Sequence, residues 1–189
     1  MRIILKTSFL LLVVISFSCK NNFTPKPRGY FRIDFPDKNY QLFDSTCPFS
    51  FEYPTYGEIV NKGNTNNPCW MDIRFDDYQA SIHLSYKEVH NNLISYLEDS
   101  RTLAYKHTIK ADAINENVFY EPERRVFGIF YEIEGNAASS VQFFLTDSLA
   151  HFVRGSLYFN VQPNQDSLAP AISFFKQDVI HLMQTFRWK

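Results

Sequence analysis

Several short stretches of the chain alternate hydrophobic and polar residues with a period of two, which is typical of strands that bury one face. Residues 30–35 show this alternation and end before Pro36, so they predict a first strand. Asp76 and Asp77 separate two such stretches, and residues 70–86 therefore predict a β-hairpin. The same pattern predicts strands at 49–53 and 58–60.

Two other segments repeat apolar residues at intervals of three and four, which is the spacing of an amphipathic helix. The first predicts a helix over about residues 89–106, with Asn91 or Asn92 as its cap. The second predicts a closing helix that Asp166 or Ser167 caps. Its core stripe consists of Ile172, Phe175, Val179, Leu182 and Phe186.

Four strands are expected between the two helices, at residues 114–120, 126–133, 140–145 and 149–159. The turns between the last three, at Gly135-Asn136 and Asp147-Ser148, are short enough for antiparallel pairing. The order of strands, helix, strands and helix predicts an α+β fold, with two main helices packed on an antiparallel sheet of six to eight strands.

The first eighteen residues have the pattern of a secretory signal peptide. Arg2 and Lys6 precede an apolar run at 9–15 that is too short to span a membrane as a permanent helix. Small residues then lead directly to Cys19, which is the arrangement of a bacterial lipobox. We therefore expect residues 1–18 to be removed and Cys19 to be acylated, although a free cysteine after an ordinary signal peptide would give the same pattern.

The segment after the anchor predicts a tether and then one domain. Residues 19–29 combine the lipidated cysteine with a Pro-containing linker that can hold the domain up to about 30 Å from the lipid surface. No acidic residue directly follows Cys19, which favours a domain that faces the periplasm, on either the inner or the outer membrane. Residues 30–189 are long enough for a single globular domain.

Composition narrows the class of partner. The chain has 189 residues, is 45% hydrophobic and 21% charged, and carries a formal net charge of −1. These values are those of an ordinary globular protein without a basic field for nucleic acid, so no nucleic-acid partner is expected. Aromatic residues make up 17% of the chain, and we expect most of them in the core.

Two cysteines remain once Cys19 is assigned to the anchor. In an oxidising periplasm Cys47 and Cys69 are a possible disulfide, and the alternative is a pair of buried thiols. A metal site is disfavoured, because no CxxC and no nearby histidine pair accompanies either residue.

Motifs that carry catalysis are missing from the sequence. The five histidines are scattered without HExxH spacing, and neither a GxSxG elbow nor a glycine-rich phosphate loop occurs. We therefore expect no catalytic residues, metal or cofactor, and solvent-facing or hydrogen-bonded roles for the histidines. An envelope hydrolase would need a cleft with converging groups such as His83 with Glu52 or Asp72.

Two groups of polar residues are predicted partner surfaces. Tyr30, Arg32 and Asp34 share one face of the first expected strand. Arg124 and Arg125 are placed to meet a phosphate headgroup or an acidic partner, or else lie in a solvated turn.

Several stretches, in their order and spacing, resemble the gliding-motility lipoprotein family GldD. They are PKPRGYFRIDFP (25–36), CPFSFEYPTY (47–56), PCWMDIRF (68–75), IHLSYKEVHNNL (82–93) and YKHTIKADAI (105–114). The lipobox at Cys19 agrees with this resemblance. The FEYP opening, the central helix and the closing helix that ends in TFRW also resemble, more distantly, the PsbP-like α-β-α sandwich.

The resemblance implies a non-catalytic lipoprotein of the cell envelope that is required for gliding motility and type IX secretion. Its partners would be the membrane, through the lipid on Cys19, and other gliding or secretion lipoproteins. It implies no catalytic or cofactor residues, and it pairs Cys47 with Cys69. The alternatives are a periplasmic small-ligand-binding lipoprotein that uses the groove between sheet and helix, and an envelope hydrolase.

Overall fold

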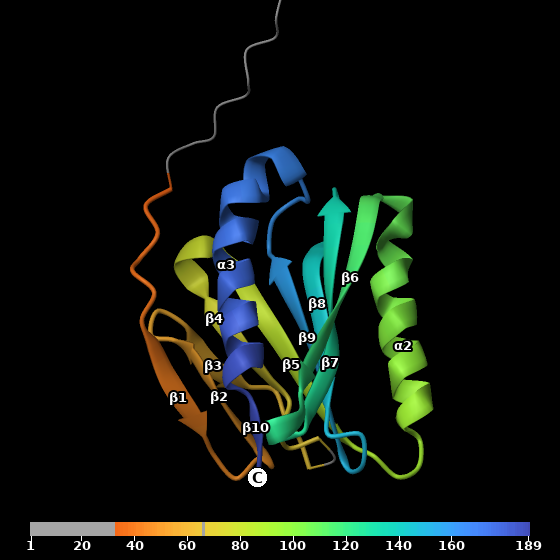
Figure 1. The fold of residues 1–189 in the computed structure, drawn as a ribbon. Coiled ribbons are helices and arrows are strands. Elements are labelled where there is room, and N and C mark those ends of the chain that lie inside the picture. The colour runs from red at the N-terminus through yellow and green to blue at the C-terminus, as the bar shows by residue number, and fades with distance from the viewer. Residues whose placement is uncertain (1–32, 66) are drawn as a thin grey trace, which may run out of the picture.

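The computed structural model describes residues 33–65 and 67–189, shown as a ribbon in Figure 1. The α-helices within this part are α2 (Leu93–Tyr105) and α3 (Gln165–Thr185). The strands are β1 (Tyr40–Asp44), β2 (Phe49–Pro54), β3 (Glu58–Asn61), β4 (Met71–Phe75), β5 (Ala80–Glu88), β6 (Ala111–Glu121), β7 (Val126–Gly135), β8 (Ser139–Thr146), β9 (His151–Phe159) and β10 (Arg187–Trp188). Three short 3₁₀ helices connect them: η1 (Asp76–Tyr78), η2 (Lys106–Ile109) and η3 (Pro122–Arg124).

The strands form two antiparallel sheets. A seven-stranded sheet has the order β3-β4-β5-β9-β8-β7-β6, and a three-stranded sheet has the order β1-β2-β10. Helix α2 packs on one face of the large sheet, against β8 and β9, whereas α3 and the small sheet cover the other face (Figure 1). The predicted α+β fold, with two main helices on an antiparallel sheet, is confirmed.

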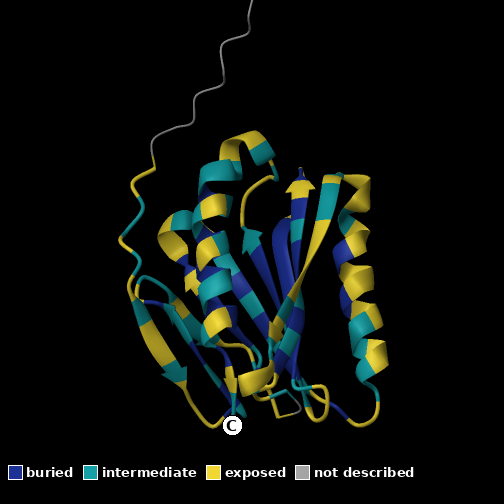
Figure 2. Cartoon of the chain, in the orientation of Figure 1, coloured by how far each residue is buried: buried dark blue, intermediate teal, exposed yellow. Residues whose placement is uncertain are grey.

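Each face of the large sheet has its own hydrophobic core, as the burial pattern in Figure 2 indicates. The larger core lies under α3, where Phe49 and Phe51 of β2 meet Phe175 of the helix. The smaller core lies under α2 around Phe144 and Phe152. Strand β8 is buried along its whole length because it lies between both layers.

The covalent link between the sheets is a disulfide. Cys47, in the turn before β2, is bonded to Cys69, which precedes β4, and their Cα atoms are 5.8 Å apart. The bridge therefore ties the small sheet to the large one across 22 residues of sequence. Of the two alternatives for these cysteines, the structure contains the disulfide.

A buried carboxylate fixes α3 to the small sheet. Asp178 is fully buried and accepts hydrogen bonds from Lys38 Nζ at 2.8 Å, Tyr40 Oη at 3.0 Å and Tyr56 Oη at 2.7 Å. Lys38 also lies over the ring of Phe174, with Nζ 3.2 Å from the ring centroid. Two segments of the chain, the start of β1 with Lys38 and the turn after β2 with Tyr56, are thereby held to the middle of one helix.

The expected first strand is wrong where the structure describes it. Residues 33–39 form no strand, and β1 follows at Tyr40–Asp44. This segment is held to the fold by one aromatic ring instead of by strand pairing, because Phe35 stacks on Phe174 of α3 with the ring centroids 4.2 Å apart. Residues 30–32 lie outside the described part of the chain.

Both helices start later or with another cap than predicted. Helix α2 begins at Leu93 rather than near residue 89, because the amide of Val89 still bonds to Ala150 O as an extension of the β5–β9 pairing. Asn92, one of the two predicted caps, occupies the N-cap position, but its side chain accepts from the amide of His90 rather than from the helix. Helix α3 is capped by Asn164, whose side chain accepts from the amide of Ser167. Asp166 and Ser167 are therefore not caps, since they already belong to the helix.

Candidate functional site

The large sheet has an uncovered polar area on the face that carries α2. The helix covers β8 and β9, which leaves the outward side chains of β4 and β5 accessible beside it. Strand alternation explains their polarity: Ile73 and Ile82 point into the core, and Asp72, Arg74 and His83 point away from it.

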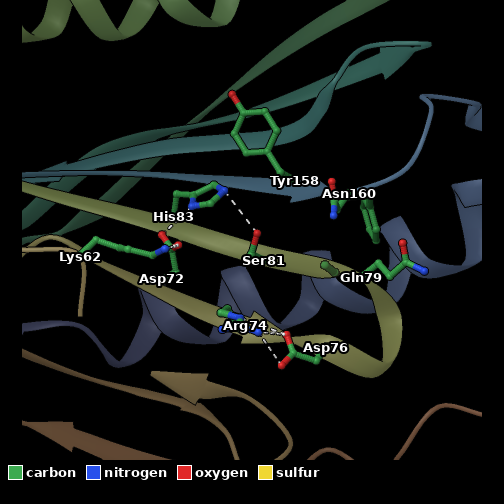
Figure 3. A pocket seen from close by; sticks show the side chains of 11 residues that line it. Lys62, Asp72, Arg74, Asp76, Gln79, Ser81, His83, Tyr158 and Asn160 are labelled. Carbon is green, nitrogen blue, oxygen red and sulfur yellow. Dashed lines mark hydrogen bonds and ion pairs between the residues drawn. The ribbon is translucent and has the colours of Figure 1, made fainter. Parts of the chain in front are cut away.

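This area encloses a shallow cavity of about 550 Å³ (Figure 3). Its side chains come from β4, β5, the end of β9 and the adjoining turns, so the antiparallel register brings together residues that are distant in sequence. The lining consists of Lys62, Asp72, Arg74, Asp76, Gln79, Ala80, Ser81, His83, Tyr158, Phe159 and Asn160.

A chain of three side chains crosses the cavity. Asp72 and His83 are directly opposite in the β4–β5 register, and His83 Nδ1 lies 2.6 Å from Asp72 Oδ1. Because a carboxylate only accepts, Nδ1 carries a proton, and Nε2 lies 3.3 Å from the hydroxyl oxygen of Ser81. Asp72 is almost fully buried, whereas His83 is partly exposed.

Cations flank this chain on both sides. Lys62 Nζ lies 3.5 Å from Asp72 Oδ2. Arg74, the cross-strand neighbour of Ser81, donates to both carboxylate oxygens of Asp76 at 2.7 Å. That carboxylate raises the pKa of the Arg74 guanidinium through hydrogen bonding and charge.

The order Asp72–His83–Ser81 is that of an acyl-transfer triad, but such an enzyme also needs N–H donors aimed at the developing oxyanion. Strand β5 pairs with β4 and β9, so the backbone amides around Ser81 serve the sheet. The nearby guanidinium of Arg74 is bonded to Asp76. The arrangement is therefore better suited to binding a polar partner, through charges of both signs, than to acyl transfer.

Among the described residues, no group of three or more histidine, cysteine or acidic side chains is arranged to hold a metal ion. In the same part of the chain, no helix is long and apolar enough to cross a membrane.

Comparison of the sequence with known protein families decides the class of protein. The family described as gliding motility lipoprotein GldD matches this sequence over residues 20–188. The chain belongs to the GldD family. The resemblance inferred from the sequence is thereby confirmed, and a lipoprotein family implies a lipid-anchored protein of the cell envelope. The family description names no reaction.

Solved structures show what the fold is similar to. The solution structure of a cyanobacterial PsbP (CyanoP) from Synechocystis sp. PCC 6803 aligns with a TM-score of 0.50 at 12% identity. The alignment covers 82% of this chain and 95% of that chain. At this identity the similarity concerns the fold alone. The comparison with curated proteins found no match.

Of the predicted partner residues of this GldD-family chain, the structure describes Asp34, Arg124 and Arg125. Cys19, Tyr30 and Arg32 lie outside the described residues. Asp34 is exposed, and its backbone carbonyl accepts from Tyr78 Oη at 3.3 Å. It lies outside any strand, so the strand face on which it was placed does not exist there.

Arg124 and Arg125 lie in the turn between β6 and β7. Arg124 is half-buried, forms an ion pair of 3.1 Å with Glu121 and donates to the carbonyl of Gln184, which ties the turn to the end of α3. Arg125 is exposed and adopts a left-handed backbone with φ of 53°. Of the two, Arg125 is thus the side chain with its surface open to a partner.

Four of the histidines form hydrogen bonds or an ion pair, in agreement with the prediction. His83 pairs with Asp72, whereas Glu52 pairs with His181, whose Nε2 is 2.7 Å from Glu52 Oε2. Sequence reasoning missed Lys62, Arg74 and Tyr158 as part of the polar site. The outward polar positions of residues 70–86 carry the signal for Arg74, but nothing local predicts that Tyr158 lies beside Ser81.

Proposed function

We propose that this protein is a non-enzymatic lipoprotein, acylated on Cys19, that supports assembly or stability of the gliding-motility and type IX secretion machinery. The family match over residues 20–188 carries this proposal, and the lipobox that ends at Cys19 agrees with it.

A periplasm-facing position is supported by two features. The Cys47–Cys69 disulfide belongs to proteins of oxidising compartments. The tether after Cys19 carries no acidic residue next to the anchor. We therefore place the domain in the periplasm, within about 30 Å of the membrane that holds the lipid.

The polar site supports a binding role over an enzymatic one. Lys62, Asp72, Arg74 and Asp76 give it charges of both signs, which is the chemistry of a polar protein surface. An envelope hydrolase remains the second candidate, because Asp72, His83 and Ser81 are connected as in a triad. We favour binding, since the backbone amides around Ser81 are engaged in the sheet.

Deletion of the gene tests the proposal, with surface spreading and the profile of secreted proteins measured side by side. We expect both to be lost and to return with the wild-type gene. Cys19→Ala should fail to restore them, whereas Ser18→Ala, which keeps a small residue before the cysteine, should succeed. Normal spreading and secretion in the deletion strain would refute the role, and full rescue by Cys19→Ala would refute the anchor.

A further inference from the structure

A second cavity, of about 340 Å³, lies beneath α2 and apart from the polar site. Residues of β5 and β9 line it from the sheet and residues of α2 from the helix, together with Trp70 and Lys106 of η2. This volume is within the range of sites that hold small molecules.

The charge of this cavity is predominantly positive. Lys87, Lys106 and Arg154 line it, against the single acidic side chain of Asp99 on α2. Ser85 and Arg154 are cross-strand partners, and Lys87 follows two residues further along β5 on the same face. The register of the sheet therefore groups two of the three cations.

Arg154 is the unusual member of this group. It is half-buried, and among the described residues no carboxylate forms an ion pair with it. Its hydrogen bond runs from Nη2 to Oε1 of Gln142 at 2.6 Å, and burial lowers the pKa of the guanidinium. A partly desolvated cation without an anion is costly, so this site lacks a counter-charge.

A second donor beside Arg154 is also without a partner. The side chain of Gln142 is 1% exposed, and its Nε2 has no acceptor. Its carbonyl oxygen is already taken by Arg154, so the amide group can only donate. Buried donors in folded proteins are normally satisfied, so the surroundings of Arg154 lack an acceptor as well as a counter-charge. Gln142 does not line the cavity, and Arg154 is therefore the group that a ligand in the cavity would meet.

Aromatic side chains also line the cavity. Trp70 is held in place by its indole N–H, which donates to Tyr86 O at 2.9 Å. Tyr96 contacts Phe152 at a centroid distance of 5.4 Å, and Lys87 Nζ lies 4.6 Å from the centre of the Tyr96 ring. A ligand in this cavity would therefore meet both cations and aromatic rings.

From these observations we propose that the cavity beneath α2 binds a small organic oxyanion, a carboxylate or phosphate monoester on an apolar or aromatic body. The oxyanion lies at Arg154, with Lys87 and Lys106 beside it, and the apolar part lies against Trp70 and Tyr96. This binding activity goes beyond the proposed envelope role and does not depend on it.

The pKa of His107 reports on whether an anion is bound at Arg154. Burial and then the charge of Arg154 lower the pKa of this imidazole. An oxyanion bound to Arg154 offsets that charge and raises the pKa of His107. A ligand bound elsewhere on the protein leaves it unchanged.

The test uses the full-length lipoprotein in a nonionic detergent, with phenyl phosphate and benzoate as probes and phenol as their uncharged match. The chain has two tryptophans, so the indole N–H signals of Trp70 and Trp188 are followed by NMR. We expect either oxyanion to shift the Trp70 signal with saturation, to leave Trp188 in place and to raise the pKa of His107, whereas phenol does not. The two probes distinguish a phosphate ligand from a carboxylate ligand.

Variants make the assignment specific. Arg154→Gln should weaken binding of the responding probe about tenfold or more, which is the usual effect of losing a charge-assisted contact. Lys106→Gln, at an exposed position that does not threaten folding, should weaken it measurably, whereas Lys110→Gln outside the cavity should not. The proposal is overturned if neither oxyanion shifts Trp70, if phenol acts equally, or if both cavity variants bind like the wild type.

Discussion

Lys38 and Asp178 are separated by 140 residues, and their side chains form an ion pair of 2.8 Å between the segment before β1 and the middle of α3. The carboxylate is fully buried, whereas the ammonium group is partly accessible and also donates to Phe174 O at 3.0 Å. This pair, rather than strand pairing, attaches the first described segment of the chain to the helix.

Asp178→Ala should lower the free energy of unfolding by about 3–5 kcal/mol, because it leaves the partly buried ammonium of Lys38 and two tyrosine hydroxyls without their acceptor. Urea unfolding monitored by circular dichroism measures the change. Asp76→Ala is the matched control, because this exposed carboxylate binds Arg74 at the surface and should cost at most about 1 kcal/mol. Equal stability of the two variants would contradict the assigned role of Asp178.

Replacing Cys47 and Cys69 together by serine should destabilise the folded chain by about 2–5 kcal/mol, because the unfolded chain regains the freedom that the cross-link removes. The wild-type protein under reducing conditions should show a similar loss, and the double variant should not respond to the reductant. A wild-type protein whose unfolding midpoint is the same with and without reductant would argue against a stabilising bridge.

Ser81→Ala should leave spreading and secretion intact in a complemented deletion strain. The substitution removes one hydroxyl, whose bond to His83 is 3.3 Å long, and leaves the charges of the polar site in place. A hydrolase that used Ser81 as nucleophile would lose its function, typically by several orders of magnitude. Failure of Ser81→Ala, at normal protein level, would therefore favour the enzyme over the binding surface.

The free energy of unfolding should fall as pH rises from about 10 to about 12. Burial raises the pKa of Tyr86 and Tyr131 to about 12, and burial together with the charge of Asp178 raises the pKa of Tyr40 and Tyr56. Unfolded tyrosines release their protons near pH 10, so the unfolded state ionises first and gains stability over that range.

The opposite contribution comes from Lys38, whose pKa is lowered by burial, but a single lysine is outnumbered by these tyrosines. Urea unfolding at several pH values, with tyrosinate absorbance in parallel, measures the effect. A constant free energy of unfolding up to pH 12 would show that the tyrosines ionise freely in the folded protein.

The elements with strong local patterns could be predicted from the sequence, whereas the places set by distant contacts could not. The alternation in residues 80–86 gave β5 and its faces, because one side is core and the other solvent. Residues 33–35 show the same alternation without forming a strand, since Phe35 is recruited by a ring on α3. Tertiary contact thus overrode the local pattern.

The candidate sites follow the same division. The sequence offered Glu52 or Asp72 as a partner of His83 without deciding between them; the structure places Asp72 opposite His83 and Glu52 against His181. The third strand of the polar site, β9, joins only through a pairing across about 70 residues. Whether Arg154 is buried also depends on that pairing and on the position of α2. The sequence alone therefore does not show that this cation lacks a counter-charge.

The strand order of the small sheet has a consequence for how the chain acquires its fold. Strand β2 lies between β1 and β10, and Trp188 pairs with Phe49, so the sheet needs residues from both ends of the described chain. Contacts of such long sequence separation form late, after the local hairpins of the large sheet. A chain that emerges from a translocation channel with its N-terminus first can therefore pair β4 to β9 while later residues are still in the channel. It completes the three-stranded sheet only after residue 188 has been released.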